Sequence, residues 1–182
     1  MRNTILKALL GTAVIVLVVT VINVRADVRF GISAGESGLN GFYIFVSEYN
    51  RVPQEEVIFL KNYGISDEEL PVVFFLSEKA GVKPEAVIKL RQRGFSWMKT
   101  AKKLKLNPEI FYSGRMHDRC GLSDFEIVRI INTRGISEYH NCRPEIVDKM
   151  RGNHMTFREI DSHLREKTKS VYKYKMREKK HK

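Results

Sequence analysis

The sequence predicts an all-α fold built from short helices in helix-turn-helix-like repeats. Three observations lead to this prediction: an internal repeat at an offset of 30 residues, glycine and proline where helices should end and begin, and only two cysteines, too few to hold a disulfide-built miniprotein. Hydrophobic residues make up 43% of the 182 residues and charged residues 29%, which excludes a disordered tail and a multi-span membrane protein. One compact domain fits this length.

The first 26 residues have the pattern of a signal peptide. Basic residues flank the start of an apolar stretch over residues 8–22, and Val24-Arg25-Ala26 matches a cleavage site. We therefore expect a mature protein that begins at Asp27 and is periplasmic or secreted. The alternative is an uncleaved anchor in the inner membrane, formed by residues 5–24. Both place the chain after Asp27 on the oxidising side of the membrane.

Residues 27–41 are predicted to form a flexible arm rich in glycine and serine, with Val28-Arg29-Phe30 as a candidate short β-strand. In this arm Gly31-Ile32-Ser33-Ala34-Gly35 matches the G-x-S-x-G nucleophile elbow of α/β hydrolases. That motif requires a serine on a strand-to-helix turn of an α/β sheet, and no alternation of strands and helices follows. We therefore expect no catalytic residue here.

Residues 42–164 are predicted to form the helical repeat domain. At the offset of 30, Phe45–Ser66 and Phe75–Ser96 share ten identities in 22 positions. The condensed unit begins with Glu. Val follows two residues after this Glu, an apolar residue five, Gly nine, and Ser or Thr eleven residues after it. The unit starts at Glu55, Glu85 and Glu126, and in a weaker copy, with His154 in place of the glycine, at Glu145.

Each position of the unit has a physical reason. Glutamate in the first turn complements the helix dipole, glycine ends the helix in the left-handed conformation, and Ser or Thr caps the next helix. Gly64, Gly94 and Gly135 are therefore expected to end helices. The helix before Gly135 is predicted over residues 123–134, followed by an extended return segment from Ile136 to Asn141.

The segment Leu90–Leu104 also resembles the first two helices of a DNA-binding helix-turn-helix, and Lys99, Lys102, Lys103 and Lys105 could contact phosphate. The same turn recurs in copies without a basic face. Nucleic acid is therefore not the partner that we expect, and DNA binding stays an alternative function.

Residues 165–182 form a basic tail with nine basic and two acidic residues, whereas residues 27–164 carry 20 basic against 19 acidic residues. We expect this tail to make peripheral contact with an anionic surface such as phospholipid, or with an unknown envelope protein. Deletion after Leu164 is expected to abolish the contact and to leave the helical body intact. The candidate binding residues are Lys167, Lys169, Lys173, Lys175, Arg177, Lys179, Lys180 and Lys182.

Cys120 and Cys142 are predicted to form a disulfide, because the return segment after the third helix would bring the sulfurs together in an oxidising compartment. The alternative is a tetrahedral zinc site made of His117, Cys120, His140 and Cys142. A third option is two unpaired cysteines. Apart from this zinc alternative, we expect no cofactor.

Three segments, Asp67–Phe75, Gly94–Met98 and Pro108–Tyr112, resemble segments of exported bacterial proteins with no assigned activity. The resemblance covers most of the mature chain. It implies an exported helical protein and supplies no catalytic residue, ligand or partner. Together these observations predict a non-catalytic envelope binding or structural module; the alternatives are a metal-binding protein or enzyme that uses the His/Cys cluster, and the DNA-binding protein.

Overall fold

The computed structural model describes residues 37–112 and 121–180, with side chains described for residues 41–112 and 121–170. Within these ranges the fold is all-α, with eight α-helices, two 3-10 helices and no strand, which confirms the predicted fold class. The described residues all belong to one compact unit, Ile32–Lys182. The signal segment and the candidate strand Val28–Phe30 lie outside the described residues.

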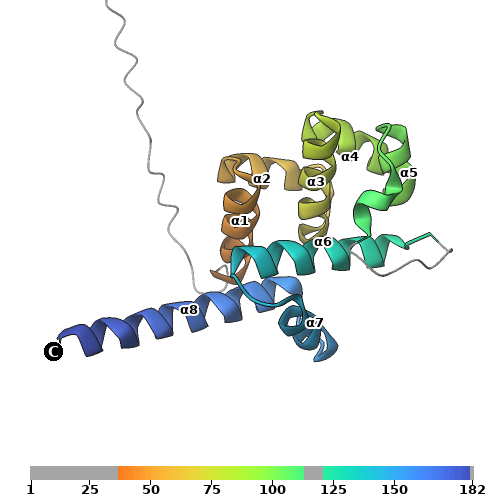
Figure 1. Cartoon of the computed structure of the whole chain (residues 1–182). Helices are drawn as coiled ribbons and strands as arrows, with labels where there is room; N and C mark the ends of the chain where they lie inside the picture. Colours follow the sequence, from red (N-terminus) through yellow and green to blue (C-terminus); the bar gives the residue numbers. More distant parts are fainter. Residues whose placement is uncertain (1–36, 113–120, 181–182) are drawn as a thin grey trace, which may run out of the picture. The chain divides into compact units, whose positions relative to one another are not determined.

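Short helices follow one another along the chain (Figure 1). In order they are α1 (Ser37–Asn50), α2 (Gln54–Lys61), η1 (Asp67–Glu69), α3 (Leu70–Ala80), α4 (Pro84–Gln92), α5 (Trp97–Lys103), η2 (Pro108–Phe111), α6 (Asp124–Tyr139), α7 (Pro144–Gly152) and α8 (Phe157–Lys180). In the described part, no helix is both long enough and apolar enough to cross a membrane.

The repeat unit is a pair of helices joined by a left-handed residue, and it occurs as α1–α2, α3–α4 and α6–α7. The first turn has Arg51, Gly81 or Asn141 at positive φ. The next residue closes the helix with a backbone bond from its N–H to the carbonyl of a serine five residues earlier: Val52 to Ser47 at 3.0 Å, Val82 to Ser77 at 3.1 Å and Cys142 to Ser137 at 2.9 Å.

A second left-handed residue ends the second helix of each pair. Gly64 and Gly94 both have φ of 78°, which confirms the predicted turns, and His154 takes the same place in the weak copy with φ of 66°. The residue two positions later begins the next element. Ser96 caps α5 by accepting from the Lys99 N–H, and Thr156 shares a capping box with Glu159 at the start of α8.

Gly135 does not end a helix, so the prediction for the copy that starts at Glu126 is wrong. The helix α6 runs through Gly135 to Tyr139, and no extended return segment exists from Ile136. Aromatic rings of α1 occupy the space beside this glycine. A Cβ atom at this position would lie only 3.1 Å from Cζ of Phe45 and 3.3 Å from Cε1 of Tyr49. Gly135 therefore allows α1 and α6 to pack closely.

Two predicted segment boundaries also change. The helix α1 begins at Ser37, inside the range assigned to the arm, and α8 continues without a break through Leu164 into the range assigned to the tail. The first and last helices pack on each other: α8 contacts α1, α6 and α7, while α1 also contacts α2, α3 and α6. The core that they enclose includes Phe42, Phe45, Leu70, Ile136 and Ile160, each fully buried.

Candidate functional site

Helix α8 combines a buried half with a charged half. Phe157, Ile160 and Leu164 are at most 6% exposed and belong to the core. From Glu166 to Ser170, by contrast, every side chain is exposed. We call residues 166–180 the cationic half of α8; it holds seven basic residues and two acidic ones. The basic segment is thus the continuation of a helix whose base is embedded in the core.

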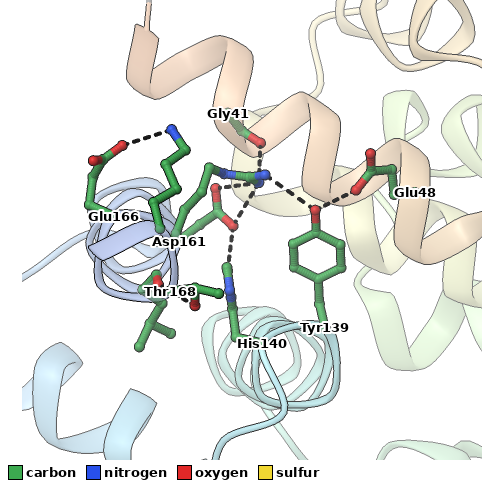
Figure 2. Close-up of polar contacts among 10 residues, drawn as sticks. Gly41, Glu48, Tyr139, His140, Asp161, Glu166 and Thr168 are labelled. Carbon is green, nitrogen blue, oxygen red and sulfur yellow. Dashed lines mark hydrogen bonds and ion pairs between the residues drawn. The ribbon is translucent and has the colours of Figure 1, made fainter. Parts of the chain in front are cut away.

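A buried polar cluster fixes the base of this helix (Figure 2). The carboxylate of Asp161, 0% exposed, accepts from Nη2 of Arg165 at 3.2 Å on both oxygens, and Nε2 of His140 lies 2.8 Å from its Oδ1. Nη2 of Arg165 also donates to the Gly41 carbonyl at 3.0 Å. These residues, with Tyr139 and Glu48, are called the Asp161 cluster below. It links α8 to α1 and α6.

The outer part of the cluster passes through one tyrosine. Nη1 of Arg165 donates to the Tyr139 hydroxyl at 3.2 Å, and that hydroxyl donates to the Glu48 carboxylate. Burial, followed by the hydrogen bond to Glu48, raises the pKa of Tyr139, so its hydroxyl stays protonated. Burial alone would lower the pKa of Arg165, but the charge of Asp161 and the bond to Tyr139 outweigh it and raise that pKa. The guanidinium therefore keeps its charge.

This geometry suits a structural role for His140. A histidine paired with a carboxylate can transfer protons when its ring reaches a substrate. Here the side chain is 7% exposed and Nε2 already faces the fully buried Asp161. The pair therefore holds α6 to α8.

A surface cavity of about 490 Å³ is lined by residues of α6, α7 and the turn between them, together with Tyr112, and Cys142 is one of its lining residues. Burial raises the pKa of the Cys142 thiol, and the neighbouring Ser137 hydroxyl lowers it by less. A protonated thiol is a poor nucleophile and a poor metal ligand. The other polar side chains that line the cavity are Tyr112, Arg129, Thr133, Arg134, Ser137, Glu138, Asn141 and Asp148.

The structure describes part of the predicted His/Cys site. His117 and Cys120 lie outside the described residues, so the disulfide from Cys120 to Cys142 and the zinc alternative stay predictions. Among the described residues, no group of three or more His, Cys, Asp or Glu side chains could hold a metal ion. Nε2 of His140, one of the candidate ligands, lies 2.8 Å from Oδ1 of Asp161.

Seven of the eight predicted surface-binding residues follow Arg165 on α8. Lys167 and Lys169 are exposed, and Lys169 pairs with Glu166 at 2.9 Å. Lys173, Lys175, Arg177, Lys179 and Lys180 belong to the helical backbone of α8, and Lys182 lies outside the described residues. Arg165 itself belongs to the Asp161 cluster, so deletion after Leu164 would leave Asp161 buried without its arginine.

Sequence reasoning missed Asp161 and Arg165. A signal was present, since Asp161 lies between the apolar positions Ile160 and Leu164 and has an arginine four residues later. A carboxylate on the apolar side of a helix is expensive to bury unless it is paired. That pattern, taken alone, indicates an internal ion pair.

Comparison of the chain with protein-family models, with curated proteins and with solved structures found no match. The resemblance to exported bacterial proteins therefore stays a prediction from the sequence.

Proposed function

We propose that this protein is a non-catalytic envelope binding module that attaches to anionic phospholipid through the cationic half of α8. The observation that carries the proposal is the continuity of α8. One helix of 24 residues begins in the core and ends in a segment where basic residues outnumber acidic ones seven to two over residues 166–180. Attachment then orients the whole helical body with respect to the surface.

Electrostatics supplies the affinity. A basic residue near an anionic membrane contributes on the order of 1 kcal/mol. The Asp161 cluster supports this role because it holds the helix base in one orientation, so that less conformational freedom is lost on binding. Salt screens the attraction, so binding should weaken as ionic strength rises.

The test measures sedimentation with vesicles. The chain from Asp27 onward is suitable because it contains the whole compact unit Ile32–Lys182 and lacks the apolar stretch over residues 8–22, which would enter any bilayer. We expect binding to vesicles of phosphatidylglycerol and phosphatidylcholine, and none to phosphatidylcholine alone. The α8 variant combines Lys175→Gln, Lys179→Gln and Lys180→Gln. It should bind anionic vesicles about 100-fold more weakly than the unmodified chain.

A matched control removes the same charge elsewhere. Lys79, Arg143 and Lys149 are exposed and lie outside α8, so the control variant replaces these three with glutamine. It should bind within about threefold of the unmodified chain, because charges beyond the Debye length are screened. Equal losses in both variants, or tighter binding to a DNA duplex than to anionic vesicles at the same salt concentration, would overturn the proposal.

A further inference from the structure

Basic and acidic residues are unevenly distributed within residues 27–164, although the total charge of this body is close to zero. Between Lys83 and Lys105 the chain has eight basic residues and one acidic residue, whereas the rest of residues 27–164 has 12 basic and 18 acidic residues. The structure gathers the basic segment into α4, the turn at Gly94, α5 and the residues directly after it. The body is therefore locally cationic although its total charge is close to zero.

Six cations of this segment are exposed to solvent, and none of them pairs with an acidic side chain among the described residues. We call them, with the half-buried ring of Phe95, the α4–α5 face; the six cations are Lys89, Arg93, Lys99, Lys102, Lys103 and Lys105, all exposed. Arg91 is the contrast, since it bonds inward to Glu69 and Asp124, both at 2.7 Å.

Three of the cations converge on the ring of Phe95. The Lys99 Nζ lies 4.8 Å from the ring centroid, the Arg93 Cζ 5.3 Å and the Lys103 Nζ 5.7 Å. The negative faces of an aromatic ring attract cations and offset part of their mutual repulsion. An aromatic ring amid long cationic side chains also matches the lipid interface, where rings lie at headgroup depth and ammonium groups reach phosphates.

The α4–α5 face and the cationic half of α8 lie on different parts of the molecule. Helix α5 packs on α4, α6 and η2, whereas α8 packs on α1, α6 and α7. Within the described unit, α5 and the C-terminal end of α8 lie at opposite ends (Figure 1). One flat membrane that contacts the end of α8 would therefore leave the α4–α5 face uncovered.

We propose that the α4–α5 face binds a second anionic phospholipid bilayer, so that the protein bridges two membranes. This inference rests on the proposed attachment of α8, which supplies the first contact. Charge complementarity supports an anionic bilayer as the binding partner of the α4–α5 face. Its six cations and the ring of Phe95 would contact a surface of phosphate groups. The remaining body is acidic, which disfavours its lying flat on an anionic bilayer and keeps the two cationic ends available for different surfaces.

Vesicle clustering followed by dynamic light scattering tests the bridge, and sedimentation of the same samples tests attachment. The unmodified chain from Asp27 should both sediment with anionic vesicles and cluster them. The face variant, Lys99→Gln, Lys102→Gln and Lys103→Gln together, should sediment through α8 with affinity reduced less than about threefold, yet lower the initial clustering rate at least about tenfold. The control variant at Lys79, Arg143 and Lys149 should cluster like the unmodified chain.

The two measurements separate failure of this inference from failure of the proposed function. Sedimentation without clustering, or clustering that persists in the face variant, overturns the bridge and leaves attachment through α8 intact. Absence of sedimentation with anionic vesicles overturns both. Helical circular dichroism of the face variant, whose three substitutions are all at exposed positions of α5, should match that of the unmodified chain. A face variant that sediments less than the α8 variant would also overturn the assignment of the primary contact to α8.

Discussion

Asp161 is fully buried, and its carboxylate is central to the packing of α8 on α1 and α6. It balances the charge of Arg165 and lies 2.8 Å from Nε2 of His140, and the residue is 0% exposed. Buried ion pairs add little net stability over apolar packing, but removal of one partner leaves the other charge buried and unpaired. The stability of the packed α8 therefore depends on a carboxylate at position 161 more than on the number of contacts around it.

We expect Asp161→Ala to lower the free energy of unfolding by about 3–5 kcal/mol. Arg165 would stay beside the Gly41 carbonyl of α1 but would lose the carboxylate that balances its charge. Urea denaturation followed by circular dichroism measures the change. Asp148→Ala is the matched control, since the Asp148 carboxylate is 47% exposed and lies 4.0 Å from Arg129. It should cost less than about 1 kcal/mol. Similar losses in the two variants would mean that the cluster does not stabilise the fold.

At the level of residues, the sequence allowed a correct prediction wherever local chemistry decides the conformation. Gly64 and Gly94 are such positions, because a left-handed residue after a helix is a backbone requirement that only glycine meets without strain. Asp161 is the opposite case. The pairing of Asp161 with Arg165 has a local signal, but the other contacts of the cluster are distant in the sequence. His140 lies 21 residues before Asp161, and Gly41, which accepts from Arg165, lies 124 residues before that arginine, so no local pattern could name them.

At the scale of elements, Gly135 shows why one residue pattern produced two structures. A glycine nine residues after a first-turn glutamate can end a helix or can lie inside one where another helix approaches closely. The distinction depends on Phe45 and Tyr49, which belong to α1 and are distant in the sequence. The same reasoning explains the error in the return segment, and it removes the geometric support for bringing Cys142 back along α6.

We predict that Gly135→Ala destabilises the protein by about 1–3 kcal/mol, although alanine is the better helix former by about 1 kcal/mol. The new methyl group would lie 3.1 Å from a Phe45 ring that is already held between Phe42 and Tyr139, at centroid distances of 5.5 and 5.3 Å. Thermal unfolding followed by circular dichroism measures the effect.

Gly152→Ala is the control for this prediction. Gly152 is the last residue of α7, and nothing lies within 4 Å of a Cβ atom there. Helix propensity alone should then raise the stability by up to about 1 kcal/mol. The two glycine substitutions should therefore have opposite signs, and stabilisation by both would show that α1 yields easily at Gly135.

For the whole molecule, the decisive feature is that the last helix returns to the first. In an open array of repeats each unit contacts only its neighbours, and local parts can unfold separately. Here α8 packs on α1, and the backbone N–H of Phe157 donates to the Glu68 side chain at 3.1 Å, which ties the start of α8 to η1. The internal repeat was predictable from self-similarity, but this closure was not, because α8 lies outside the repeat.

Closure predicts that the chain unfolds as one cooperative unit, and the single tryptophan offers a direct test. Trp97 is fully buried in α5, whereas Ile160 is fully buried in α8, a helix that packs on α1, α6 and α7. We expect Ile160→Ala to lower the free energy of unfolding by about 2–5 kcal/mol. Urea denaturation should show the same shift by Trp97 fluorescence and by far-ultraviolet circular dichroism, because α8 cannot loosen without releasing α1 and, through the shared core, α5. If fluorescence kept its original midpoint while circular dichroism shifted, the repeats would unfold independently and α8 would be only an appended helix.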